Sequence, residues 1–246
     1  MPQDIHDLET ELDTLANRYR GAGGVGIQLL NLLGGQAEGL LDRLPPMVRG
    51  QLQSGTESAL KIAMKAAHGS RGVLGDQPMW LNTAVSTAMG AAGGFGGLPA
   101  AMAELPVTTT VLLRAIQGVA VEHGFDPAAE NVQFDCIQVF SAAGPLAGDD
   151  GADLAFLSAR MSLQGAALNT LIARVAPRLA AVLGQKLAAQ AVPVMGAVAG
   201  AATNYAYTSY YQEIAHVHFG LRKLAIEADR PEADLRRALQ ERVALP

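Results

Sequence analysis

Two long runs of small, uncharged residues limit the folds open to this chain more than any other feature of its sequence. The first run, AAGGFGGLPAAMAELPVTTTVLLRAI, extends from Ala91 to Ile116, and the second, AQAVPVMGAVAGAATNYAYTSYYQEIAHVHF, extends from Ala189 to Phe219. Small side chains let two helices approach closely, and polar groups caught in such contacts need hydrogen-bond partners or cost ~1–3 kcal/mol each. We therefore expect the tightest helix crossing, and a polar site, in these two runs.

The composition and the spacing of apolar residues indicate helices throughout. Half of the 246 residues are hydrophobic, but only 5% are aromatic and 27 are glycine, so alanine, leucine and valine must fill the core. The only β-branched cluster, VTTTV at 107–111, is short and continues into a helical pattern. The sequence predicts an all-α protein, a compact multi-helix domain with Gly/Ala-rich core helices, about nine or ten helices in all.

Glycine, proline and capping residues give the expected helix boundaries. A Gly-rich joint at 21–26 and the prolines at 106 and 177 are taken as breaks, and Asp126, Pro127 and Glu130 as a helix start. The expected helices are Asp4–Arg20, Ile27–Leu44, 46–67, Pro78–Ala92, Pro106–His123, Asp126–Ala142, Ala152–Ala173, Pro177–Gln190, Pro193–Ala228 and a last one that ends near Val243.

The domain organisation expected from the sequence is a single structural domain with two layers. Residues 1–67 form N-terminal helices packed on the core, and residues 68–246 form the helical core with its C-terminal helix. No linker rich in charge, proline or serine separates the two parts.

Several classes of protein are disfavoured by charge and by cysteine and histidine usage. The net charge of -5 argues against a nucleic-acid partner, and Arg236-Arg237 is interpreted as part of a solvated helix face. The single cysteine, Cys136, excludes an intrachain disulfide, and no Cys/His spacing suggests a metal site. We expect no cofactor, and the acidic N-terminus is unlike a secretory signal. These features predict a cytoplasmic protein, either free or peripheral to the inner membrane.

Two uncharged stretches are long enough to be examined as membrane spans. Gln77–Ala103 and Leu187–Gln212 each exceed the ~20 residues that cross a bilayer. Both are interrupted by proline and glycine and diluted with polar residues. We therefore expect buried core helices, or segments that visit a membrane surface, in place of true spans.

Isolated charges in apolar surroundings are the first candidates for a site. Arg114 lies in VLLRAIQGVA, and Glu104 lies before Pro106 near the start of the same predicted helix. Asp135 and Arg160 are similarly isolated. A structural ion-pair network is favoured over a binding or catalytic centre, and both interpretations stay open.

Polar residues on the long closing helix are the second group of candidates. Asn204, Thr208, Tyr211 or Gln212, and His216 share one stripe at a spacing of about four residues, and Lys186 precedes them by a short segment. The stripe predicts interhelical hydrogen bonds, with Thr108 of the first run as a further member. His216 is interpreted as a hydrogen-bonded core histidine, with a general base as the alternative.

At these residues the chain resembles the EcsC protein family. The resemblance rests on ELPVTTTVLLRAI (Glu104–Ile116), CIQVF (Cys136–Phe140), Arg160 in FLSAR, and GQKLAAQAVPVMGAVAGAATNYAYTSYYQEIAHVHFGLRKL (Gly184–Leu224), and covers roughly Gly55–Ala228. It implies a bacterial, helical protein whose family is named from a gene beside an ABC exporter linked to secretion. The family has no settled activity, and no residues here support its occasional peptidase-like label.

Two functions from different classes follow as hypotheses. The leading one is a helical accessory protein that binds a lipid, a membrane surface or a membrane-protein partner such as an ABC exporter, because the uncharged runs are long and no nucleophile or metal motif is framed. The alternative is a hydrolase in which His216 or Glu104 activates water while Arg114 or Lys186 stabilises an anion.

Overall fold

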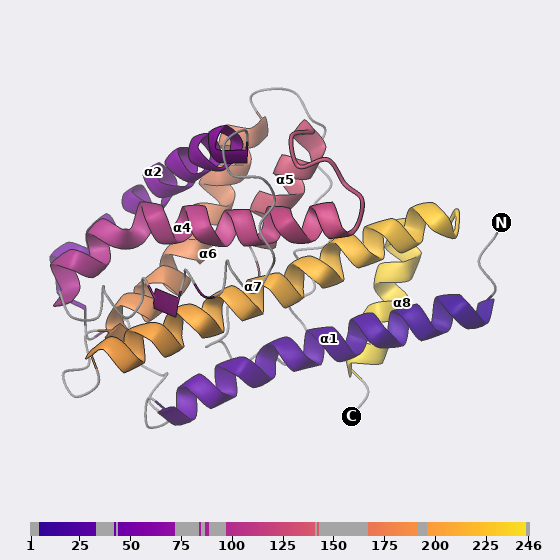
Figure 1. Ribbon diagram of the computed structural model, residues 1–246, viewed down its shortest axis with the longest axis horizontal. Coiled ribbons are helices and arrows are strands. Elements are labelled where there is room, and N and C mark those ends of the chain that lie inside the picture. The colour runs from indigo at the N-terminus through magenta and orange to yellow at the C-terminus, as the bar shows by residue number, and fades with distance from the viewer. Residues whose placement is uncertain are drawn as a thin grey trace.

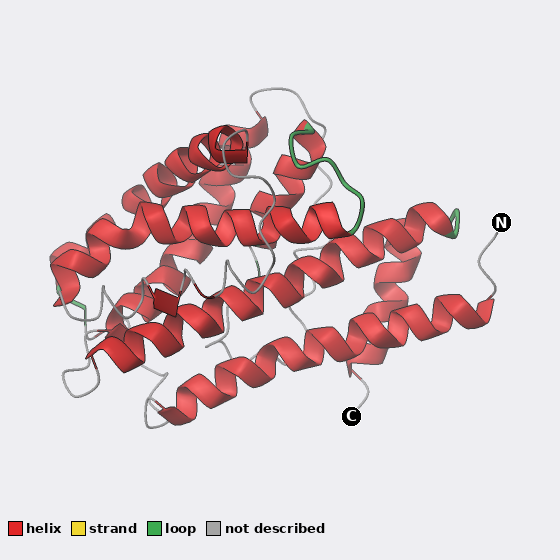
Figure 2. Cartoon of the chain, viewed as in Figure 1, coloured by secondary structure: helices red, strands yellow, loops and turns green. Residues whose placement is uncertain are grey.

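The computed structural model describes residues 5–32, 42, 44–71, 84, 87–88, 97–140, 142, 167–190 and 196–244. Helices dominate these residues, and none of them lies in a strand (Figure 2). The all-α prediction is therefore confirmed. The helices are α1 (Ile5–Leu32), α2 (Pro46–Arg71), α4 (Gly97–Glu122), α5 (Glu130–Val139), α6 (Ala167–Gln190), α7 (Gly196–Glu227) and α8 (Glu232–Ala244).

The expected nine or ten helices are wrong for the described part of the chain, which forms seven longer ones. The error lies at the presumed breaks, because α1 continues through the Gly-rich joint at 21–26, α4 through Pro106 and α6 through Pro177. A glycine inside a helix costs only about 1 kcal/mol relative to alanine. Ala22, within that joint, is fully buried, so tertiary packing on this side of α1 outweighs that cost.

Pro177 is tolerated inside α6 for a local reason, and α4 continues through Pro106 into the β-branched cluster. Ala173 and Pro177 are both exposed on α6, so the carbonyl that Pro177 leaves without a donor is on the solvent side. On α4 the hydroxyls of Thr109 and Thr110 donate to the carbonyls of Leu105 and Pro106, both at 2.7 Å. The β-branched cluster at 107–111 is thus part of a helix, in which two of its hydroxyls bond back to the preceding turn.

The start signal at Asp126 was placed four residues too early. The carboxylate of Asp126 accepts a hydrogen bond from the Ala128 N–H at 2.9 Å, which stabilises a turn, and α5 begins only at Glu130. Its N-cap residue, Ala129, makes no side-chain capping bond. A short polar residue before proline can stabilise either a turn or the start of a helix, so the sequence alone does not distinguish these two structures.

The long helices α4, α7 and α1 lie in one stack, with α7 in the middle (Figure 1). α2 packs on α4 and α6, α5 joins α4, α6 and α7, and α8 crosses α1 and α7 near the N-terminal end of α1. The predicted boundary between residues 67 and 68 falls inside α2. α7 contacts α1, α4, α5, α6 and α8, which makes it the central helix and explains why so many of its polar residues are buried.

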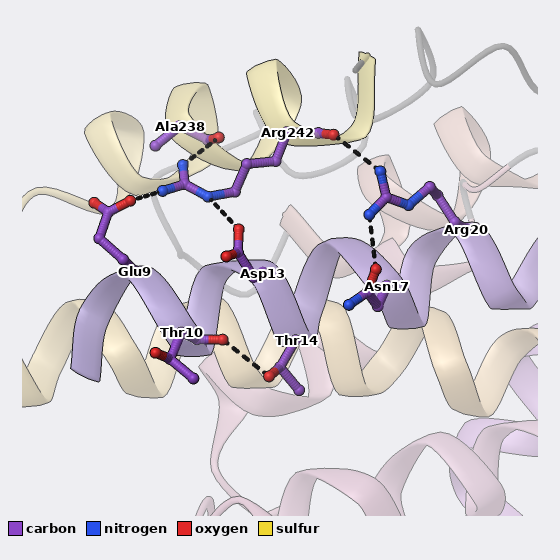
Figure 3. A network of polar contacts seen from close by, with 8 residues as sticks. All are labelled: Glu9, Thr10, Asp13, Thr14, Asn17, Arg20, Ala238 and Arg242. Atoms are coloured by element: carbon purple, nitrogen blue, oxygen red, sulfur yellow. Dashed lines mark hydrogen bonds and ion pairs between the residues drawn. The ribbon is translucent and has the colours of Figure 1, made fainter. Parts of the chain in front are cut away.

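α1 and α8 form an outer layer on α7. Gly220 of α7 allows the closest approach, since a Cβ there would lie 2.7 Å from Cδ2 of Leu15. Arg242 of α8 pairs with Glu9 and, at 2.9 Å, with Asp13, both on α1 (Figure 3). Arg20 donates to the Arg242 carbonyl at 3.2 Å. An apolar stripe on α1 and these polar contacts at its edge therefore hold the layer in place.

The described residues contain no helix that is long and apolar enough to cross a membrane. Most of the uncharged stretch at 77–103 lies outside them, whereas the latter part of 187–212 belongs to α7, much of which is buried inside the fold.

Replacing Tyr211 with phenylalanine should raise the free energy of unfolding by about 1 kcal/mol. The Tyr211 hydroxyl is fully buried and has no hydrogen-bond partner among the described residues, so the fold bears its desolvation without compensation. Tyr207→Phe is the matched control, because the Tyr207 hydroxyl donates to the Val182 carbonyl at 3.1 Å and its loss should destabilise. Urea unfolding of both variants measures whether each substitution raises or lowers the free energy of unfolding. Equal losses of stability would show that the two hydroxyls do not differ in hydrogen bonding.

Candidate functional site

Two of the predicted polar residues meet at the crossing of α4 and α6. The Lys186 amine donates to the Thr108 hydroxyl at 3.1 Å, and both side chains are buried. Asn204 and Thr208 on α7 are buried as well. A buried ammonium needs acceptors for its N–H groups, and the Thr108 hydroxyl is one of them. The contact therefore stabilises the core of small residues.

The structure describes only some of the remaining candidate side chains. Gln212 and His216 are buried on α7, and Arg114 is only partly buried on α4. Glu104 lies near the start of α4, and its side chain is outside the described residues, as is the whole of Arg160. His216 meets the other end of α4, and at 1.5 Å per residue that is about 27 Å from Glu104 along a straight helix.

A pair of histidines closes the C-terminal end of α4 against α7. His123 Nε2 and His216 Nδ1 are 3.1 Å apart, and His216 Nε2 is 3.8 Å from a carboxylate oxygen of Glu122. Burial, and then the charges of Arg18 and His123, lower the pKa of His216 to about 4. Burial, and then Lys223 and Arg18, also lower the pKa of His123. An N–H···N bond between two rings requires an unprotonated nitrogen, so the geometry and the lowered pKa values both favour neutral rings.

The sequence singled out His216 but neither of its partners. Glu122 and His123 stand at the end of a helix, directly before Gly124, which has φ 83. A glycine in that conformation ends helices and is recognisable in a sequence. The end of α4 had to be placed against α7 before Glu122 and His123 could be connected with His216.

Asp135 of α5 forms the predicted ion pair with a residue that the sequence did not suggest. It pairs with Arg222 of α7, and its other carboxylate oxygen is 3.5 Å from His218 Nε2. The Arg222 guanidinium also lies 4.8 Å from the centre of the Phe125 ring. Arg222 is therefore held from two sides, by a carboxylate and by an aromatic face.

His218 lies fully buried beside this ion pair. Burial lowers its pKa to about 4, against a raising effect of Glu232 and with a further lowering effect of Arg236. Glu232 and Arg236, which cause these two effects, belong to the first turns of α8. A neutral His218 is the expected form at physiological pH.

An open pocket of about 580 Å³ lies above these groups, at the corner between α7 and α8. Its lining residues are Arg222, Ala225, Ile226, Arg230, Pro231, Glu232, Ala233 and Arg236. Arg236 pairs with Glu232 at 3.2 Å, and its Nε is buried without a hydrogen-bond partner among the described residues. Ile226 is 66% exposed. The pocket thus combines three guanidinium groups with a large apolar side chain in solvent.

The interpretation of Arg236-Arg237 as a solvated face is right for one residue and wrong for the other. The side chain of Arg237 is 71% exposed, whereas that of Arg236 is 13% exposed and turned into the pocket. The arginines of the pocket come from two helices and from the Asp229–Pro231 turn between them, where Asp229 has φ 50. No linear motif links them, so the cluster exists only once α8 folds back on α7.

The described ranges contain no group of three or more His, Cys, Asp or Glu side chains that could hold a metal ion. Of the groups above, the arginine pocket has an open volume in which a ligand fits, and the histidine pair has the arrangement of a proton-transfer group.

Comparison with known proteins gives one match. The EcsC protein family model covers residues 53–224, from α2 to the last turn of α7. No curated protein and no solved structure matches the chain. α1, α8 and every pocket residue except Arg222 lie outside the matched range. Because the match covers more than half of the sequence, including the central helices α4, α6 and α7, this chain belongs to the EcsC protein family.

Proposed function

We propose that this protein is a non-catalytic accessory protein that docks on an anionic membrane surface through the corner between α7 and α8. The observation that carries the proposal is the pocket at this corner, with three arginines beside an isoleucine that is 66% exposed. Side chains of these two kinds are what a peripheral protein presents to a bilayer, where the apolar one enters the interface and the basic ones meet phosphate groups.

The size of the expected interaction supports docking but not insertion. Transfer of one isoleucine side chain out of water is worth about 1.5–3 kcal/mol, and each arginine near an anionic surface adds about 1 kcal/mol. The sum corresponds to weak, reversible binding. Since the whole chain carries a net charge of -5, only a local cluster of this kind offers an attractive face.

A membrane-protein partner, such as an ABC exporter, is the rival occupant of the same corner. It differs from the lipid proposal in a measurable way, because such a partner would retain the protein on native membranes and leave protein-free vesicles unbound. Vesicle binding therefore decides between the two.

A hydrolase remains the second candidate function, and the contact of His216 with His123 and Glu122 is the observation that favours it. A carboxylate next to a neutral imidazole is the arrangement of a general base. Its weakness is that Lys186 is engaged with Thr108 on a different part of α4, so the anion-stabilising group would have to come from elsewhere. A hydrolytic activity abolished by His216→Asn in a folded protein would establish this candidate over the first.

Replacing Ile226 with alanine should weaken binding to anionic vesicles about five- to tenfold, because several apolar carbons no longer leave water. Ile62→Ala is the matched control, since Ile62 is also an exposed isoleucine, at 52%, but belongs to α2. Vesicle flotation of both variants, with their unfolding curves, gives the comparison. Equal losses for the two variants, or none for Ile226→Ala, would remove the corner from the docking surface.

A further inference from the structure

The pocket between α7 and α8 has the donors of an anion site. Each guanidinium presents a planar fork of N–H groups that matches two oxygens at once. Arg222 is fixed by Asp135 and by the Phe125 ring, and Arg236 is fixed by Glu232. Donors that are already held in place lose little conformational entropy when a ligand binds.

Arg236 and Arg230 have different parts in this arrangement. Arg236 keeps a buried Nε donor with no acceptor among the described residues, which is an unusual state for a guanidinium N–H. Arg230 is exposed and lines the same pocket, at the turn between the two helices. One arginine thus lies within the pocket, and the other can close over a ligand from the turn.

The start of α8 adds to the attraction for an anion. Pro231, Glu232 and Ala233 line the pocket, and Glu232 and Ala233 are the first two residues of this helix. The first N–H groups of a helix have no acceptors within the helix, and its N-terminus carries a partial positive charge. The helix therefore supports the same ligand charge as the three arginines.

The charge and volume of the pocket narrow the class of ligand. Three arginines face the carboxylates of Asp135 and Glu232, which leaves one positive charge in excess. A carboxylate has two oxygens, whereas a phosphate group offers at least as many acceptors as there are guanidiniums here. The volume of about 580 Å³ lies within the range of small-molecule sites and exceeds what a bare phosphate ion needs.

From these observations we infer that the pocket binds the phosphate group of an organic phosphate, with Arg222, Arg230 and Arg236 as its ligands. The inference rests on the proposed function, since it names the chemical group that the same pocket recognises. The source of that group is either a lipid head group or a free phosphate ester.

Titration of the full-length protein with glycerol phosphate in a calorimeter tests the pocket without any membrane. Arg230→Gln should weaken binding about tenfold, the usual worth of one charge-assisted hydrogen bond. Arg237→Gln removes the same charge from a neighbouring position outside the pocket and should leave affinity unchanged. Arg236→Gln is a second pocket variant whose folding is verified by its unfolding curve. Absence of saturable binding, or equal effects of Arg230→Gln and Arg237→Gln, would overturn the inference.

Vesicles separate the two sources and keep the two proposals apart. Phosphatidylcholine vesicles with phosphatidic acid should bind more protein than vesicles with an equal charge of phosphatidylglycerol, and glycerol phosphate should compete. Equal binding to both vesicles without competition overturns the phosphate inference but leaves membrane docking intact. Binding of glycerol phosphate with no binding to any vesicle supports the pocket, assigns it a free ester, and overturns the docking proposal.

Discussion

Acidification from about pH 7 to pH 4 should lower the free energy of unfolding by about 5–6 kcal/mol through two buried histidines alone. His216 and His218 have pKa values of about 4 in the folded protein, against an ordinary value of 6.5 for histidine. As the pH falls, the two histidines therefore take up protons in the unfolded chain before they do so in the folded protein. This uptake shifts the equilibrium toward the unfolded chain. Stability is complete above about pH 6.5 and is lost progressively until the pH reaches about 4.

Urea unfolding at several pH values measures this loss. The variant His218→Asn should show a shallower decline than the wild type, because one of the two titrating groups is gone. The double variant His216→Asn/His218→Asn should retain only the slope that the carboxylates and the remaining histidines, His123 among them, cause. A wild-type stability that stays constant between about pH 7 and pH 5 would show that neither histidine is held neutral.

Replacing Arg222 with methionine should destabilise the protein by about 2–4 kcal/mol. Asp135 is largely buried, and Arg222 is its principal cationic partner, so the substitution leaves a carboxylate in an apolar setting beside the neutral His218. The contact of the guanidinium with the Phe125 ring is lost at the same time.

A double-mutant cycle distinguishes loss of the ion pair from loss of packing. Arg222→Met/Asp135→Leu removes both charges and should be more stable than the sum of the two single changes predicts. Arg18→Met is the control, since Arg18 forms a more exposed pair with Glu213 at 2.9 Å and should cost less than about 1 kcal/mol. Equal losses for Arg222→Met and Arg18→Met would contradict the buried network.

The fold class could be predicted because the helical pattern and the scarcity of strand residues agree along the chain. The helix boundaries at glycine and proline were less certain, since packing decides whether a helix continues through them. Pro177 and the Gly-rich joint at 21–26 both lie inside helices for this reason. The last turn and helix, after Asp229-Arg230-Pro231, were placed correctly because that turn is exposed and its chemistry is local.

The candidate site was less accessible to sequence reasoning. Burial of the polar stripe on α7 was expected from the small residues that precede it, and Asn204, Thr208 and His216 are indeed buried. The arginine pocket was missed, because Arg222 and Arg236 belong to different helices whose side chains meet only through the fold of α8 onto α7. Sequence spacing does not show how far apart these arginine side chains lie in the folded protein.

Sedimentation of the wild-type protein with phosphatidylcholine vesicles, with and without phosphatidylglycerol, is the most direct test of membrane docking. We expect the protein to pellet with the anionic vesicles, to stay in the supernatant with the neutral ones, and to be released when salt screens the arginines of the pocket. A protein that stays in the supernatant with both kinds of vesicle at low salt would contradict it.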